Sequence, residues 1–432
     1  MIKEYSFKYG DGVVSLLLEE NQVISVLDGN KTKTISNIKE ELYSSLDNPF
    51  CSDSLRIVAA KAKSIVLVVS DMTRFWMRQD LIVPHIVSYL VDKCNKSLSD
   101  IEIIIANGTH KGGSSEDLKK LVTPEVFSSV KVINHNASDD ENLVYLGTTS
   151  FNTPVYINKD AVEADLVICL GAVTYHVMAG FGGGRKSILP GIAGLETINH
   201  NHAYSLDAKS FVSNKRIGNG VLSDNPLNED MLEAASMMKN LFMINLVTDT
   251  EFNLIKIISG HWRKSWEKAT EEVRKIYTVE IEKKADVVVT SCGGFPKDES
   301  LYQGTKAVDN VISSLKDGGT LILFLEGRNG GGSPDYFSWI KYLKNGKFEE
   351  ELRSNFTVGG YIFFLNCEQA KRFNILMYSS INPEIVKPMG IKTYSNIDSL
   401  LKDANLECKS IYIIPNGSTV LPVVKEEQKC QS

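Results

Sequence analysis

Short, continuous apolar runs that alternate with amphipathic stretches are the feature that most restricts how this chain can fold. Residues 64–70, 101–106 and 166–170 are runs of this kind, and helical patterns follow the first two at about 81–96 and 115–122. Strands that are apolar on both faces are typical of parallel sheets that helices cover on both sides. The sequence therefore predicts an α/β fold with mainly parallel sheets.

The same pattern begins again late in the chain, which predicts a second α/β domain. Residues 285–291, 320–325 and 373–378 have the character of buried strands, and a helical pattern lies at about 304–316. A chain of 432 residues is long enough for two or three domains, at about 100–200 residues each.

We expect an N-terminal domain over 1–265, a charged, helix-prone connector or hinge over 266–284, and a C-terminal domain over 285–407. The strand-like residues after Ser410 predict that 408–432 return to the first domain. The active site is expected in a cleft between the two domains.

Composition excludes several classes of function. The net charge is −6, whereas a nucleic-acid-binding surface needs a basic excess. The seven cysteines are scattered and form no CxxC pair, which indicates a reduced chain without a disulfide framework or structural zinc. The N-terminus lacks the pattern of a signal peptide, and no run approaches the roughly 18 apolar residues of a membrane span. We expect a cytoplasmic protein without nucleic-acid or membrane partners.

Polar side chains follow the predicted strands at the points where the strands end. Asp71 and Arg74 come directly after the strand at 64–70, and His110 follows the strand at 101–106. In open α/β sheets the ligand lies in the crevice at the carboxyl ends of the strands. These residues are therefore candidates for a binding site.

The densest group of unusual residues is the segment 175–202. Glycines at 180 and 182–184 allow a close approach of the backbone to a ligand, and Arg185 and Lys186 add positive charge. The segment fits an anion cradle, but its spacing matches neither a Walker loop nor the dinucleotide-binding fingerprint. A glycine run alone is a weak signal that also fits a flexible surface loop, although the nearby histidines favour a site.

The segment resembles the central motif of the nickel-dependent lactate racemase family. The matching residues are His176-x3-Gly-Phe-x-Gly-Gly-Arg-Lys-x-Ile-Leu-Pro-Gly191, followed by Glu196-Thr-Ile-x-x-Asn-His202. Four further motifs occur in the family's order. They are Asp71-x-Thr-Arg74, Asn107-Gly-Thr-His110, Gly293-Gly-Phe-Pro-x-Asp298 and Leu301-Tyr-Gln-x-x-Lys306.

The resemblance implies a nickel pincer nucleotide, pyridinium-3,5-bisthiocarboxylic acid mononucleotide nickel, attached covalently to Lys186. The protein's nickel ligand would be His202, sixteen residues after the lysine, with His200 as the local alternative. A soft ligand set with one imidazole suits Ni(II). Further contacts to the cofactor are implied at Asp71, Arg74, Gly182, Gly183, Gly184 and Arg185.

The resemblance also implies the catalytic residues. His110 and His176 would be the acid and base for the substrate hydroxyl, because the pKa of histidine lies close to neutral pH. Gln303 and Lys306 would act on the substrate from the second domain. The substrate contacts implied are Arg74, Tyr302, Gln303 and Lys306.

The implied function is an isomerase that racemises or epimerises a 2-hydroxy acid, such as lactate, by reversible hydride transfer. Its partners would be the small substrate and, transiently, the enzymes that synthesise the cofactor. Two alternatives remain at this stage: a nicotinamide-dependent or phosphate-binding α/β enzyme, and a non-catalytic relative that binds the cofactor. The resemblance does not fix the substrate's side chain or the oligomeric state.

Overall fold

Two units make up the chain in the computed structural model, which describes residues 1–425. Unit 1 contains Met1–Asn30, Ser205–Lys215 and the chain from Ile276 onward, and unit 2 contains Lys31–Tyr204 and Arg216–Lys275. Each unit has a six-stranded sheet that is wholly or mainly parallel. The predicted α/β class is confirmed.

The sheet of unit 2 has the strand order β13-β12-β9-β4-β5-β6, and only the pair β12–β13 is antiparallel. Its strands are β4 (Ile65–Ser70), β5 (Ile101–Ala106), β6 (Lys131–Asn134), β9 (Leu166–Ala172), β12 (Leu241–Thr248) and β13 (Leu254–His261). The chain builds outward from β4 in one direction through β5 and β6, and then in the other through β9 and β12. This reversal at β4 creates the switch point at which α/β sheets bind ligands.

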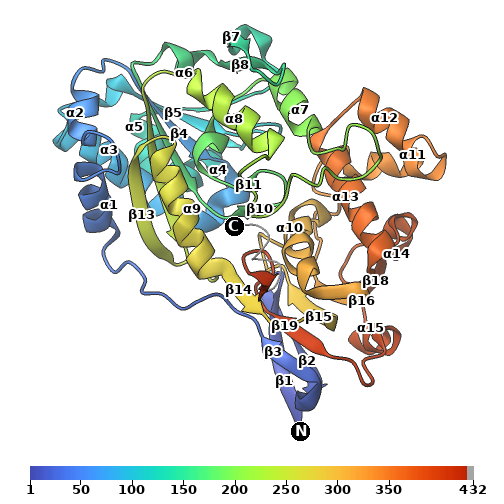
Figure 1. Ribbon diagram of the computed structural model, residues 1–432. Helices are drawn as coiled ribbons and strands as arrows, with labels where there is room; N and C mark the ends of the chain where they lie inside the picture. The colour runs from blue at the N-terminus through green and yellow to red at the C-terminus, as the bar shows by residue number, and fades with distance from the viewer. Residues whose placement is uncertain (426–432) are drawn as a thin grey trace. The chain divides into compact units, whose positions relative to one another are not determined.

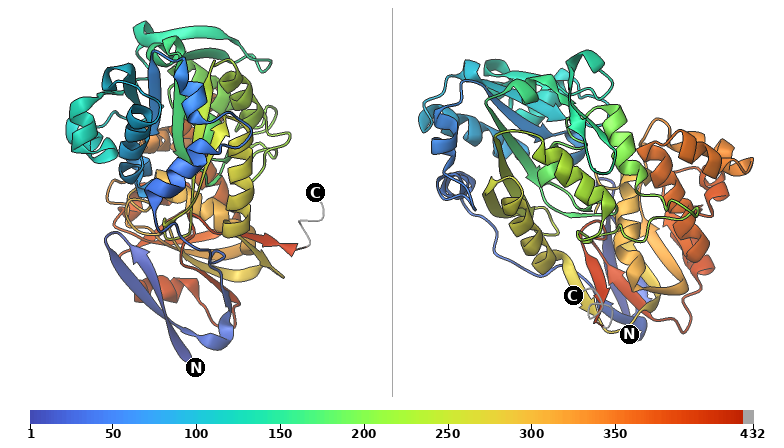
Figure 2. Two further views of the ribbon diagram at one scale, coloured as in Figure 1. Left: turned by 90° about the vertical axis from the view of Figure 1, so that its left-hand side faces the viewer. Right: turned by 45° about the horizontal axis from the view of Figure 1, so that its top comes forward.

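Helices cover both faces of this sheet, as the continuous burial of its central strands requires. One face packs against α1 (Ile38–Asp47), α2 (Leu55–Ala60), α3 (Val83–Asp92), α4 (Ser115–Val122) and α5 (Pro124–Ser129). Helix α9 (Lys264–Tyr277) lies on the other face, because Asn245 of β12 points away from that core and its Nδ2 donates to Ser265 Oγ at 3.0 Å. Helix α8 (Pro226–Ser236) lies on the same side as α9 (Figures 1 and 2).

Smaller elements of unit 2 complete the region around the sheet. Two antiparallel pairs are β7 (Leu143–Thr148) with β8 (Pro154–Asn158), and β10 (Tyr175–His176) with β11 (Gly180–Phe181). Three short helical elements follow them in the chain: α6 (Lys159–Glu163) after β8, then η6 (Gly184–Ser187) and α7 (Leu195–Ala203) after β11. Among residues 1–425, none of the helices has both the length and the apolar character needed to span a bilayer.

The sheet of unit 1 has the order β18-β17-β16-β15-β19-β3, with every pair parallel. These strands are β3 (Val23–Val26), β15 (Ala285–Ser291), β16 (Leu315–Phe324), β17 (Asn374–Tyr378), β18 (Lys392–Tyr394) and β19 (Ile411–Ile414). One face is covered by the hairpin β1 (Ile2–Tyr9)–β2 (Gly12–Glu19) and by α15 (Ile397–Ala404). Helices α10 (Leu301–Val311) and α13 (Val358–Arg372) also belong to this unit.

The division of the chain differs from the predicted boundaries in four places. Residues 1–30 belong to unit 1, where β3 pairs with β19. The predicted return of 408–432 to the first domain is wrong for β19, which lies beside β15 in unit 1; residues 426–432 lie outside the described part of the chain. Most of the predicted connector is helix α9, which belongs to unit 2 up to Lys275. Apolar periodicity identifies a strand but does not say which strand it pairs with.

The fourth difference is a short return of the chain from unit 2 to unit 1, which the sequence did not predict. Directly after α7, residues Ser205–Lys215 form part of unit 1. Arg353 Nη1 donates to the carbonyl of Asp207 at 3.0 Å, and the Ser213 N–H donates to Glu368 Oε1 at 2.9 Å. No local pattern in this polar segment indicates that it leaves one unit for the other.

Candidate active site

The predicted site residues of unit 2 gather where three neighbouring strands end. Asp71 follows β4 directly, Asn107–His110 follow β5, and His176 lies four residues beyond the end of β9. Since β9, β4 and β5 are adjacent in the sheet, their carboxyl ends lie side by side. These residues therefore lie at the switch point of the sheet.

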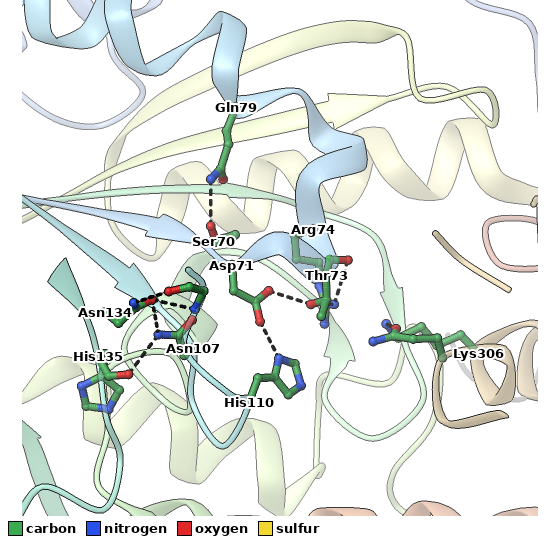
Figure 3. A network of polar contacts seen from close by, with 12 residues as sticks. Ser70, Asp71, Thr73, Arg74, Gln79, Asn107, His110, Asn134, His135 and Lys306 are labelled. Carbon is green, nitrogen blue, oxygen red and sulfur yellow. Dashed lines mark hydrogen bonds and ion pairs between the residues drawn. The ribbon is translucent and has the colours of Figure 1, made fainter. Parts of the chain in front are cut away.

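Asp71 and His110 form a close hydrogen-bonded pair (Figure 3). His110 Nδ1 lies 2.6 Å from Asp71 Oδ2. Burial disfavours the charge of Asp71, but the hydrogen bond and charge of His110, the charge of Arg74 and the hydrogen bond from Thr73 outweigh it, so the pKa of Asp71 lies below its ordinary value. The ionised carboxylate orients the imidazole and can stabilise its protonated form.

Arg74 is linked to this pair through Thr73 (Figure 3). The Thr73 hydroxyl donates to Asp71 Oδ1 at 2.6 Å, and Arg74 Nη1 donates to Thr73 Oγ1 at 2.8 Å. Asp71 thus orients His110 directly and Arg74 through the hydroxyl of Thr73. Thr73, between them in the same motif, is a member of the site that sequence reasoning missed.

The loop that carries His110 is held by main-chain hydrogen bonds. Asn107 Nδ2 donates to the carbonyl of His135 at 3.0 Å, and the Gly108 N–H donates to the carbonyl of Gly191 at 3.0 Å. His135 is buried and bonds through Nε2 to the carbonyl of Ala193 at 2.9 Å. Burial lowers the pKa of His135, which fits a neutral, structural histidine.

His176 lies in the small antiparallel pair β10–β11, and its ring is fixed from one side. The backbone N–H groups of Met178 and Ala179 both donate to His176 Nδ1, each at 3.2 Å. Met178 itself is buried.

The glycine-rich segment packs tightly beneath the site. Gly183 and Gly184 have φ values of +66° and +53°, in the left-handed region that favours glycine. A Cβ on Gly184 would lie 2.3 Å from Trp266 Cγ, so no side chain fits there. Trp266 Nε1 donates to the carbonyl of Gly182 at 3.0 Å. Trp266, which the sequence placed in a connector, supports this loop from α9.

Arg185 is fully buried within the same loop. Its Nη1 donates to the carbonyl of Phe181 at 2.7 Å and its Nη2 to that of Ala179 at 2.6 Å, and its guanidinium lies 4.0 Å from the Trp266 ring centroid. Within residues 1–425 no carboxylate forms an ion pair with it, and burial lowers its pKa to about 9. Arg185 therefore supports the loop through hydrogen bonds to its carbonyls, and its charge lies close to Lys186.

Lys186 is half-buried. Its amine lies close to the positive charges of Arg185 and Arg74. Burial of the amine and the charges of Arg185 and Arg74 hold the pKa of Lys186 well below its usual value. A neutral amine is a nucleophile, whereas the ammonium form is not. The site thus favours the form of Lys186 that can react covalently.

His202 on α7 is buried, while His200 on the same helix is exposed. His202 Nδ1 bonds to the carbonyl of Ile198 at 2.9 Å. Burial and the charge of Lys186 lower the pKa of His202 to about 3, against a smaller effect of the Ile198 carbonyl, so the ring is neutral. Nδ1 then carries the proton, and Nε2 is the nitrogen with a lone pair.

A buried polar network holds α7 in place. The Asp230 carboxylate on α8 accepts from Asn201 Nδ2 at 2.8 Å, Thr149 Oγ1 at 2.6 Å and Thr153 Oγ1 at 2.8 Å. Because Asn201 precedes His202 directly, this network fixes the position of the histidine. No sequence motif pointed to Asp230.

The other predicted residues, Tyr302, Gln303 and Lys306, lie on α10 of unit 1. Gln303 is buried, and Lys306 Nζ donates to Gln303 Oε1 at 2.8 Å. The helix begins at an N-cap in which Ser300 Oγ accepts from the N–H of Gln303. Gln303 and Lys306 therefore lie on one face of α10.

Comparisons with known proteins point to one family. The family model "Lactate racemase N-terminal domain" matches residues 9–213, and "Lactate racemase C-terminal domain" matches residues 280–422. The lactate racemase of Thermoanaerobacterium thermosaccharolyticum is 33% identical over 339 residues, covering 78% of each chain. That of Lactiplantibacillus plantarum is 31% identical over 302 residues, covering 69% of this chain and 68% of the relative.

Solved structures agree with this result. The lactate racemase apoprotein of T. thermosaccharolyticum superimposes with a TM-score of 0.87 at 28% identity, over 98% of this chain and 100% of that one. A protein from Thermotoga maritima gives a TM-score of 0.67 at 20% identity, over 90% and 97% of the two chains, which shows a shared fold alone.

Proposed function

This chain belongs to the lactate racemase family and is an isomerase of the racemase type, and we propose that it racemises a 2-hydroxy acid by hydride transfer to a nickel pincer nucleotide attached to Lys186. One observation carries the proposal most strongly. Unit 2 combines an Asp71–His110 pair at the strand ends with Lys186, whose pKa is lowered, and with the buried, neutral His202. These are the groups that such a cofactor and such a reaction need.

The residues present fit the covalent attachment of the cofactor. Lys186 has a depressed pKa and follows a loop in which Gly183 and Gly184 leave no room for side chains. Arg74 and Arg185 add positive charge close to the amine. A neutral amine beside positive charge suits reaction with an anionic nucleotide that carries a thiocarboxylate.

The residues also fit the nickel ion. Among residues 1–425 no group of three or more His, Cys, Asp and Glu side chains is arranged to hold a metal. We propose His202 as the protein's ligand, because the hydrogen bond of Nδ1 to the Ile198 carbonyl sets the tautomer and leaves the lone pair on Nε2. The sulfur and carbon donors would come from the nucleotide, consistent with the preferences of Ni(II).

Replacing His202 by alanine should remove the nickel without removing the nucleotide attached to Lys186. We expect nickel bound per chain to fall by at least about tenfold, while the mass of the adduct on Lys186 persists. Elemental analysis and intact-protein mass spectrometry measure the two quantities. His200→Ala, on the exposed side of the same helix, is the matched control and should keep its nickel. Nickel loss in His200→Ala alone would reverse the assignment.

The chain's own residues provide the rest of the chemistry. When bound, the cofactor would supply the acceptor for the hydride that leaves C2 of the substrate. His110 and His176 act on the hydroxyl oxygen, with His110 oriented by Asp71. Arg74 offers a guanidinium for the substrate carboxylate, and we propose that Tyr302, Gln303 and Lys306 contribute further substrate contacts.

A chirality assay tests the proposal. Protein co-produced with the cofactor-synthesis enzymes is given single enantiomers of lactate and of other 2-hydroxy acids, and the opposite enantiomer is followed by chiral chromatography. We expect both directions to reach an equal mixture without net production of 2-keto acid. Accumulation of keto acid with stoichiometric reduction of added nicotinamide nucleotide would instead identify a dehydrogenase.

A further inference from the structure

The hydrogen bonds around His110 and His176 hold the two imidazole rings in different tautomers. Asp71 is ionised, and a carboxylate can only accept a hydrogen bond. The 2.6 Å contact with Asp71 Oδ2 therefore places a proton on His110 Nδ1. In the neutral ring, His110 Nε2 is then the unprotonated nitrogen, which can take up a proton.

His176 is held in the other tautomer. The backbone N–H groups of Met178 and Ala179 can only donate, and both point at His176 Nδ1 at 3.2 Å. Nδ1 is therefore the acceptor, and the proton of the neutral ring lies on Nε2. Protonation of Nδ1 would set an N–H against two N–H donors and remove both hydrogen bonds. The surrounding turn thus fixes Nδ1 of His176 as a hydrogen-bond acceptor, whereas Asp71 fixes Nδ1 of His110 as a donor.

We propose that the two histidines have different tasks: His110 transfers the proton, and His176 remains a neutral hydrogen-bond donor to the substrate oxygen. The proposal rests on the racemase function proposed above. As the C2–H bond breaks and hydride leaves with its electron pair, the hydroxyl proton passes to His110 Nε2 and the C–O bond becomes a carbonyl. The Nε2–H of His176 polarises that carbonyl without giving up its proton.

The return step uses the same groups. Hydride comes back to the opposite face of the carbonyl carbon, and His110 returns its proton to the oxygen. For the product to be inverted, the keto acid must turn about its C2–O axis, so that the oxygen stays with the same two histidines. Asp71 acts as a positioning residue for His110, and the turn Met178–Ala179 has this role for His176.

A spectroscopic experiment tests the tautomers without cofactor or substrate. The full chain is labelled with ¹⁵N-histidine, and long-range ¹H–¹⁵N correlations distinguish protonated from unprotonated ring nitrogens. Spectra of His110→Gln and His176→Gln assign the two rings. We expect the proton on Nδ1 in His110 and on Nε2 in His176 at neutral pH. The same tautomer in both rings, or a doubly protonated His176, would overturn the proposal even if the chain racemises its substrate.

Kinetics of the cofactor-loaded enzyme test the tasks. The amide nitrogen of glutamine can replace the Nε2–H donor but cannot take up a proton, so His176→Gln should keep kcat within about tenfold of the wild type. His110→Gln should lower kcat by roughly 10²–10⁴-fold, the range for a lost proton-transfer group. His176→Leu, which cannot donate, should fall well below His176→Gln, and His85→Gln on α3 is the control.

An equal fall of kcat in His110→Gln and His176→Gln would show that both residues transfer protons and would overturn the division of tasks. Should the wild type itself not racemise any 2-hydroxy acid, the proposed function fails, and the tautomer measurement alone decides whether the two rings differ. The two failures are therefore distinguishable.

Discussion

Asp71→Asn is expected to lower kcat by roughly 10²–10⁴-fold, although no atom of Asp71 need touch the substrate. The asparagine amide can donate to His110 Nδ1, which would move the proton of the ring to Nε2 and remove the proton acceptor. It also removes the negative charge that stabilises the imidazolium form. The same substitution of the aspartate of a serine-protease triad has an effect of this kind, because it leaves the histidine in the wrong tautomer.

Two measurements distinguish this positioning role from a loss of structure. The ¹⁵N spectrum of His110 should change to the Nε2–H tautomer, while nickel content and the adduct on Lys186 remain. Asp80→Asn, in the same segment and paired with Arg78, is the matched control and should change neither kcat nor the spectrum. A normal rate with an unchanged His110 tautomer would refute the role assigned to Asp71.

Lys186→Ala should abolish both the covalent adduct and all racemisation, the largest effect expected for any single replacement. The amine is the only group of this side chain that can form the bond, and its lowered pKa favours the unprotonated, nucleophilic form. Intact-protein mass spectrometry of the co-produced protein should show an adduct of mononucleotide size on the wild type and none on the variant.

Two companion variants make this test specific. Lys186→Arg keeps a positive charge but offers no nucleophilic amine, so it should also lack the adduct. Lys239→Ala removes an exposed lysine of the same unit and should carry the adduct as the wild type does. An adduct mapped to a lysine other than Lys186 would contradict the assignment.

Much of the fold follows from the sequence because buried parallel strands have a strong local signature. The strands at 101–106 and 285–291 begin and end where their apolar runs do, and β4 and β17 differ from their predicted bounds by one residue. Strand β16 begins at Leu315, five residues earlier than predicted. The prediction missed this start because Lys316–Gly318 are exposed and carry no apolar pattern. Local patterns of this kind do not extend to pairing between distant segments.

The candidate site was predictable in part. The residues after β4 and β5 were found because parallel strands place their carboxyl ends at one edge of the sheet. Trp266 and Asp230 were not found, although one packs against Gly184 and the other fixes the helix of His202. A tryptophan or an aspartate within an ordinary helix carries no local signal of the loop or helix that it will support.

The sequence by itself determined the class of the fold, the residues at the strand ends and the family motif that contains Lys186 and His202, because each depends on order and spacing along the chain. Only the tertiary structure decided that β3 and β19 share a sheet, that α9 supports the glycine loop, and that His110 and His176 are held in opposite tautomers. These features depend on which groups from distant segments meet, and on whether each group donates or accepts a hydrogen bond. A one-dimensional pattern contains neither kind of information, since packing and hydrogen-bond direction are set only when the chain has folded.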